Sequence, residues 1–202
     1  MAPDATEHMG PGELEEESPR SLRVRAFFAL PVPDPQRAEL ARFVASCADG
    51  APDFRWTPAD NLHLTIRFIG SVGRAVVEGV ADALAGSPPA AFDVELGDVG
   101  TFGRGPATRV VWLGLRAGAE EAARVAARVE EECVRAGLPS EERAFTAHLT
   151  LARARPRGGA RLPDLPASPR LPGWRADRLI LYSSHLARSG ALYEPLRSLT
   201  LK

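Results

Sequence analysis

The sequence has little of several residue types that would indicate a specialised class of protein. Its 202 residues include two cysteines and one lysine, Lys202, and no apolar run approaches the roughly 20 residues that a membrane-spanning helix needs. The first 21 residues have neither the basic start nor the apolar centre of a signal peptide. Cys47 and Cys133 stand singly, without metal-site spacing, and are interpreted as small buried thiols. These absences predict a cytoplasmic protein that has no disulfide framework and no membrane partner.

Charge is unevenly distributed along the chain. Residues 1–20 hold six acidic side chains against Arg20, a net charge of −5; since the whole chain carries −1, the remaining residues carry +4. We therefore expect residues 1–22 to form a disordered acidic tail, and residues 23–202 to form one domain of two lobes. A mildly basic body permits a phosphate ligand but is too weakly charged to indicate a strongly basic nucleic-acid binder.

An apolar content of 45% suits a globular fold, and its patterning predicts interleaved strands and helices. Glycine, proline and polar turn residues separate the periodic segments. We expect strands at 24–32, 54–56, 63–70, 91–102, 108–116 and from 148, helices at 33–50, 71–89 and 118–137, a loop at 155–173 and a terminal hairpin at 175–199 that turns near residues 189–190. Ser71 is the predicted N-cap of the second helix. Two hairpin-like strand pairs without an intervening helix favour an α+β fold with antiparallel or mixed sheets.

The tripeptide His-Leu-Thr occurs twice, as His63-Leu64-Thr65 and 85 residues later as His148-Leu149-Thr150. Side chains on a strand alternate between faces, so each leucine can pack inward while the histidine and threonine project together to the other side. If the two strands converge, two imidazoles can supply an acid and a base near neutral pH, and two hydroxyls can donate hydrogen bonds to phosphoryl oxygens. One copy alone is more typical of a structural histidine; the repetition favours a functional pair.

The chain resembles the RNA 2′,3′-cyclic phosphodiesterases, also called 2′-5′ RNA ligases, of the two-histidine (2H) phosphoesterase superfamily. The resemblance runs from about Arg23 to Leu199 through "RAFFALPVP", "NLHLTIRFIG", "VGTFGRGPATRVVWLGL", "RAFTAHLTLAR" and "LILYSSHLARSGALYEPL". It implies a bilobal α+β fold in which two antiparallel or mixed sheets surround a central cleft with pseudo-twofold symmetry and helices outside.

The resemblance also implies roles for individual residues. His63 becomes the proton donor to the leaving 3′ oxygen and His148 the proton acceptor from the attacking water, although the near-symmetry of the two motifs does not itself distinguish these roles. Thr65, Thr150 and Arg153 become the phosphate-binding groups, with no metal and no cofactor.

Three residues do not fit directly into the family pattern or the strand alternation. In a regular strand Arg153 would project to the same side as Leu149, away from His148. A bulge, the end of the strand or a curled side chain is needed to bring it to His148. Alternation places Arg67 on the same side of the strand as His63 and Thr65, yet the resemblance gives it no role. Ala147 stands where the family usually has proline, which loosens a turn without removing a chemical group.

Aromatic side chains offer weaker candidates. Trp56, Phe102 and Phe145 are possible stacking surfaces for a nucleobase, with core packing as the alternative for each. His185 has no HxT partner and is expected to be structural or exposed.

The expected activity is metal-independent hydrolysis of 2′,3′-cyclic phosphates at RNA or nucleotide ends to 2′-phosphates, by a monomer, with weak reverse 2′-5′ ligation. One alternative is another 2H activity, on 2′-5′ oligoadenylates or ADP-ribose cyclic phosphate. A second alternative is a module that binds a nucleotide or RNA end without turnover.

Overall fold

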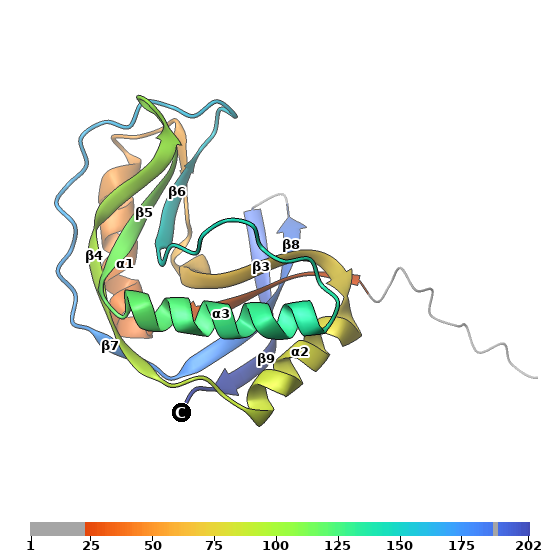
Figure 1. The fold of residues 1–202 in the computed structure, drawn as a ribbon. Coiled ribbons are helices and arrows are strands. Elements are labelled where there is room, and N and C mark those ends of the chain that lie inside the picture. The colour runs from red at the N-terminus through yellow and green to blue at the C-terminus, as the bar shows by residue number, and fades with distance from the viewer. Residues whose placement is uncertain (1–22, 188–189) are drawn as a thin grey trace, which may run out of the picture.

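The computed structural model describes residues 23–187 and 190–202, and Figure 1 shows an antiparallel sheet with three helices packed around it. The predicted acidic tail at 1–22 lies outside the described residues. The elements in chain order are β1 (Arg23–Pro31), α1 (Asp34–Ala48), β2 (Phe54–Trp56), the 3-10 helix η1 (Ala59–Asn61), β3 (His63–Gly73), α2 (Arg74–Gly86), β4 (Phe92–Arg104), β5 (Ala107–Ala117), α3 (Ala119–Arg135), β6 (Leu149–Ala154), β7 (Trp174–Ala176), β8 (Arg178–Ala187) and β9 (Gly190–Thr200).

The strands are ordered β7-β4-β5-β6-β3-β1-β8-β9, and β2 pairs with β6 beside this path. Each strand pairing in the described chain is antiparallel, which confirms the predicted α+β class. The two sheets expected from the sequence are joined into one, because Leu64 on β3 is the bridge partner of Leu149 on β6. This junction lies at the centre of the two His-Leu-Thr motifs.

α1 and α3 pack away from the strand that precedes each of them, whereas α2 packs against the strand it follows. α3 follows β5 in the chain but packs against β3, and α2 packs against α3, β3 and β9. α1 follows β1 but packs against β2 and η1. Figure 1 shows α2 and α3 below the β4–β5 hairpin tip, at a distance from it, and α2 also contacts β9. β3 is therefore covered by one helix from each part of the chain, α2 and α3.

The core consists of apolar residues from both halves in one continuous cluster. On α3, Val125, Val129 and Cys133 are all buried, as their helical spacing predicts, and Glu120 and Glu121 lie in the first turn near the positive end of the helix. Both cysteines are buried and free, which confirms their interpretation from the sequence. No helix among the described residues is long and apolar enough to cross a membrane.

Two predicted boundaries differ from the structure. Ser71 is not an N-cap: β3 continues through it to Gly73, and the Arg23 guanidinium donates to the Ser71 backbone oxygen at 2.8 Å. The expected terminal hairpin begins at Arg178, since Trp174–Ala176 is the separate strand β7 paired to β4. These boundaries depended on long-range strand pairing, which local propensity does not encode.

Candidate functional site

The two motifs meet across the sheet at the Leu64–Leu149 bridge. Because β3 and β6 run antiparallel, His63 and Thr150 flank the bridge on one side, and Thr65 and His148 flank it on the other. The two leucines are buried, so the histidines and threonines share the opposite side of the sheet. We call the side that carries His63, Thr65, His148 and Thr150 the motif face. On this register the histidines are diagonal neighbours, for which the backbone separation is about 7–8 Å.

The imidazoles are oriented by the same local hydrogen bond in both halves. The Nδ1 atom of His63 lies 2.7 Å from the backbone oxygen of Asn61, and the Nδ1 atom of His148 lies 2.7 Å from that of Thr146. A carbonyl oxygen can only accept, so each Nδ1 carries the proton. Each Nε2 atom is therefore left to exchange a proton with a ligand, as the choice of tautomer follows from the bond at the other nitrogen.

Both histidines are harder to protonate than a free imidazole. Burial is the main cause of a pKa of about 4 for His63; the Asn61 carbonyl opposes this decrease, and the positive charges of Arg153 and His148 add to it. Burial also lowers the pKa of His148, and Arg153 acts on it in the same direction. The shared influence of Arg153 means that one guanidinium lies within electrostatic reach of both imidazoles.

A β-bulge brings Arg153 to the motif face. The pairing between β5 and β6 shifts at Leu151, so that Trp112 opposes Thr150 but Val111 opposes Ala152. Leu151 and Ala152 are consequently both buried, and alternation restarts one residue later with Arg153 exposed on the side of Thr150. Strict alternation predicted that Arg153 and His148 project to opposite sides of the sheet. The extra residue in the bulge places them on the same side.

The equivalent bulge in β3 has a different result for Arg67. Pairing between β1 and β3 shifts around Ile66, which is buried, so Arg67 turns away from His63 and Thr65, and Phe68 takes the motif face with 44% of its surface exposed. The expectation that Arg67 shares the face of His63 is therefore wrong. Phe68 occupies the position, five residues after the histidine, that Arg153 occupies in the second motif.

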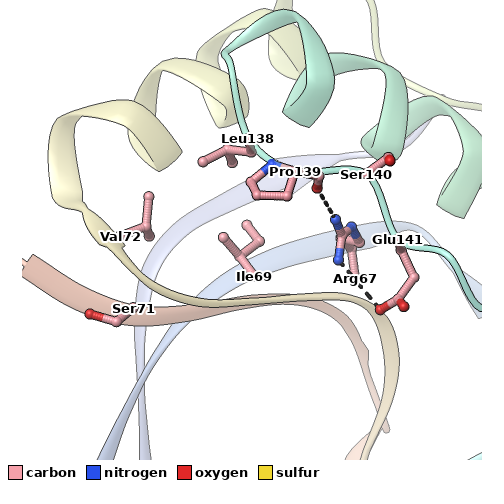
Figure 2. Close-up of a pocket in the computed structure, with 8 residues that line it drawn as sticks. All are labelled: Arg67, Ile69, Ser71, Val72, Leu138, Pro139, Ser140 and Glu141. Carbon is pink, nitrogen blue, oxygen red and sulfur yellow. Dashed lines mark hydrogen bonds and ion pairs between the residues drawn. The ribbon is translucent and has the colours of Figure 1, made fainter.

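Arg67 instead ties β3 to the segment that leads into His148 (Figure 2). Its Nε donates to Glu130 Oε2 at 2.5 Å. Its Nη2 donates to the Pro139 backbone oxygen at 2.7 Å, a contact drawn in Figure 2. Glu130 also accepts from the backbone N–H of Glu141 at 2.8 Å, and Arg67 forms an ion pair with the Glu141 carboxylate. A cavity of about 240 Å³ lies beside this network, and neither motif histidine lines it. The network connects the strand of His63 to residues 139–141, in the segment that precedes His148.

Aromatic side chains that the sequence analysis did not select surround His63. Phe27 lies 4.9 Å from the imidazole between ring centroids, Tyr193 lies 5.3 Å away edge-on, and Tyr182 lies 6.4 Å away. They come from β1, β8 and β9, so their convergence depends on the pairing of three strands. Their burial of the imidazole accounts for its low pKa.

His148 has its own aromatic neighbours. Phe102 lies 5.1 Å from the imidazole edge-on, with 37% of its surface exposed, and Trp112 lies 6.0 Å away. The Trp112 ring covers Gly100, where a Cβ atom would overlap the indole. The structure thus places the predicted Phe102 on the motif face. It also places Trp112 there, which the sequence did not indicate, since a tryptophan on a strand is equally typical of a core residue.

The other candidates lie away from the motif histidines. Trp56 opposes Ala152 on the face away from Arg153, packs against the core and donates its indole N–H to the Ala51 oxygen at 3.4 Å. Phe145 is half-buried against the core. His185 is exposed and contacts Glu194 at 3.4 Å, as the structural alternative predicted.

Comparison with known proteins adds the family. The model of the LigT-like phosphoesterases matches the chain twice in succession, over residues 30–112 and 113–193, and each match contains one His-Leu-Thr motif. The chain belongs to the LigT-like phosphoesterase family. This confirms the resemblance inferred from the motifs and explains the two halves of similar pattern.

Individual relatives extend the match over most of the chain. An RNA 2′,3′-cyclic phosphodiesterase from Aeropyrum pernix is 34% identical over 166 residues, which cover 78% of this chain and 92% of the relative. The RNA 2′,3′-cyclic phosphodiesterase of Escherichia coli K12 is 30% identical over 86% of this chain and 94% of its own length. Crystal structures of E. coli LigT in the apo form and with 3′-AMP are both 27% identical, with TM-scores of 0.76 and 0.74; each alignment covers 89% of this chain, and 98% and 99% of the respective LigT chains. The LigT-like fold is thus shared almost end to end.

Proposed function

We propose that this LigT-like phosphoesterase hydrolyses 2′,3′-cyclic phosphates at RNA or nucleotide ends to 2′-phosphates. The observation that carries the proposal is the pair of motifs joined at Leu64 and Leu149, with both Nδ1 atoms held by carbonyl oxygens and Arg153 acting on both imidazoles. Relatives named RNA 2′,3′-cyclic phosphodiesterase and a LigT complex with 3′-AMP support the same substrate class. No step of this reaction requires a redox centre.

In the proposed reaction, water attacks the cyclic phosphorus and the bond from phosphorus to the 3′ oxygen breaks. His148 accepts a proton from the water at Nε2, and His63 donates its Nε2 proton to the 3′ oxygen, which leaves a 2′-phosphate and a free 3′-hydroxyl. Positioned proton transfer of this kind contributes about 100- to 10,000-fold per group. The same sequence with a 5′-hydroxyl in place of water gives weak 2′-5′ ligation: the 5′ oxygen bonds to the cyclic phosphorus, His148 takes its proton, and the bond to the 3′ oxygen breaks.

The donor role of His63 requires a protonated imidazole, whereas its pKa of about 4 leaves it neutral at pH 7 in the free protein. A phosphate anion close to both imidazoles raises their pKa values, because an opposite charge favours the protonated form. Substrate binding thus supplies the acid that the reaction needs. The burial that lowers this pKa without ligand also makes the bound imidazolium a stronger acid towards the leaving oxygen.

Thr65, Thr150 and Arg153 are proposed to hold the phosphate. Hydroxyl donors on each side of the bridge meet the non-bridging oxygens, and the guanidinium neutralises the charge that develops on them. Phe102 is the aromatic candidate best supported for base stacking, since part of its ring is exposed beside His148. For Trp56 and Phe145, which pack against the core, stacking on a base lacks this support.

The catalytic unit is proposed to be residues 23–202 acting as a monomer without a metal ion. Two imidazoles exchange both protons in this scheme, so a Lewis acid has no required place in it. Activity is expected to persist after dialysis against EDTA. A loss of activity that Mg²⁺ or Zn²⁺ restores would contradict this part of the proposal.

The test is hydrolysis of a panel of substrates: 2′,3′-cyclic AMP, a ribonucleotide trimer ending in a 2′,3′-cyclic phosphate, 2′-5′ oligoadenylate and ADP-ribose 1″,2″-cyclic phosphate. The expected result is turnover of the first two substrates, with a 2′-phosphate identified by ³¹P NMR. Preferential turnover of either of the last two would assign another 2H activity. Binding of 3′-AMP without turnover of any member would assign a binding module.

A further inference from the structure

A second arginine lies beside Arg153 on the motif face. Arg55 on β2 is the bridge partner of Arg153 on β6, one strand further from β5. Bridge partners in an antiparallel ladder project to the same side of the sheet, with Cβ atoms about 4.5–5.5 Å apart. Since the Leu151 bulge puts Arg153 on the motif face, Arg55 lies there too.

Among residues 23–187 and 190–202, no acidic side chain pairs with Arg55 or Arg153. Both side chains are exposed, and within the described residues neither forms an ion pair, although many other arginines of the chain do. Like charges placed directly opposite on a sheet are destabilising. Two adjacent guanidinium groups without a carboxylate are the arrangement that binds an anion, and Arg is suited to phosphate through its paired N–H donors.

The position of the pair relative to the histidines suggests which anion it binds. Arg153 lies within electrostatic reach of both imidazoles, where the reacting phosphate belongs. Arg55 lies one strand spacing, about 4.8 Å, beyond Arg153. In an RNA strand the next phosphate is separated from the terminal one by a single ribose, so a long side chain next to Arg153 can reach it.

We propose that Arg55, together with Arg153, forms a second phosphate subsite that takes the phosphodiester on the 5′ side of the terminal nucleotide. The inference rests on the proposed function and narrows its substrate class. The enzyme then prefers RNA ends, or nucleotides that carry a 5′-phosphate, over cyclic nucleosides that lack one. Specificity of this kind needs no contact with the base.

The experiment compares two substrates that differ by one phosphate: adenosine 2′,3′-cyclic phosphate with and without a 5′-phosphate. We expect kcat/KM of the wild-type protein to be about 10- to 100-fold higher for the 5′-phosphorylated substrate, as for hydrogen bonds to a charged group. Arg55→Gln is expected to remove most of this preference, and Arg55→Lys to keep part of it, because lysine retains the charge without the paired donors. A preference that is unchanged in Arg55→Gln overturns the proposal.

Arg170→Gln serves as the matched control, because Arg170 is also exposed, forms no ion pair within the described residues and lies in the loop before β7. It is expected to leave both substrates unaffected. Arg55→Gln should melt within 1–2 °C of the wild-type protein, roughly as surface substitutions do.

Binding of two unreactive ligands separates this proposal from the proposed function. Adenosine 3′,5′-bisphosphate should bind more tightly than 3′-AMP in the wild-type protein and not in Arg55→Gln, measured by calorimetry, whether or not cyclic substrates turn over. Equal affinities in the wild-type protein overturn the subsite even if hydrolysis is found. Selective binding of the bisphosphate without any hydrolysis retains the subsite and refutes the reaction.

Discussion

Leu64 of β3 and Leu149 of β6 are the bridge partners through which the two halves of the described sheet are joined. Both side chains are buried, and each is flanked in sequence by a histidine and a threonine on the opposite side of the sheet. One apolar pair thereby places two imidazoles and two hydroxyls around a common centre. The chemistry of the protein follows from this junction more than from either strand alone.

The first prediction concerns the threonine hydroxyls. Thr65→Val and Thr150→Val preserve shape and strand propensity but remove a donor to the phosphate, so kcat/KM for a cyclic phosphate should fall by about 100- to 1,000-fold each. Steady-state hydrolysis of 2′,3′-cyclic AMP measures the loss. Thr101→Val, on β4, is the matched control. Wild-type activity in both motif variants would show that the hydroxyls do not hold the phosphate.

The second prediction concerns the charge of Arg153. A positive neighbour disfavours the imidazolium, so Arg153→Gln should raise the pKa of both His63 and His148. An NMR titration of the imidazole C–H signals measures both values. In the wild-type protein the His63 signal should titrate near pH 4, and inorganic phosphate should shift its midpoint upward. A change confined to one histidine would contradict a guanidinium shared by the two.

The third prediction concerns the Arg67 network. Arg67 is largely buried, and its guanidinium contacts the half-buried Glu130, the exposed Glu141 and the Pro139 oxygen, so Arg67→Met removes three polar contacts. The free energy of unfolding should fall by about 1–3 kcal/mol in urea denaturation, as for the loss of hydrogen bonds to a charged group. Because the segment before His148 loses its anchor, kcat should fall at temperatures where the variant is still folded. Arg124→Met, an exposed arginine on α3, should change neither quantity.

A fourth prediction concerns the packing beneath Trp112. A methyl group at residue 100 would overlap the indole, which packs beside His148. Gly100→Ala should therefore cost about 1–3 kcal/mol of stability and displace the ring, with a loss of kcat/KM. Gly79→Ala on α2 is the control, since a Cβ atom there meets no neighbour and alanine favours the helix. If Gly100→Ala were as stable and as active as the wild-type protein, the packing of Trp112 on Gly100 would not be what positions the ring beside His148.

The repeated motifs can be read directly in the sequence. The α+β class and the burial of the cysteines could be predicted from it, because both depend on local periodicity and composition. It was not sufficient to predict the faces of Arg67 and Arg153, since the bulges at Ile66 and Leu151 are defined by the pairing of β3 with β1 and of β6 with β5. The same limit applies to Arg55. Its proposed role depends on the register of a three-residue strand, which no local pattern encodes.

The aromatic residues around the histidines also could not be predicted from the sequence. Phe27, Tyr182 and Tyr193 lie on three strands, two of which are more than 100 residues away from His63 in the sequence. Trp56, the most conspicuous aromatic residue near the first motif in sequence, turns to the core instead. Proximity along the chain is thus a weak guide to which rings approach the imidazoles.

The central claim is that His63 and His148 act together on one phosphate. Its most direct test is the rate of 2′,3′-cyclic AMP hydrolysis by the wild-type protein, His63→Ala and His148→Ala, with His185→Ala as the control because that exposed imidazole contacts Glu194. The account predicts that each motif variant loses at least about 100-fold in kcat while it remains folded, and that the control retains full activity. Full activity in either His63→Ala or His148→Ala would contradict the two-histidine mechanism.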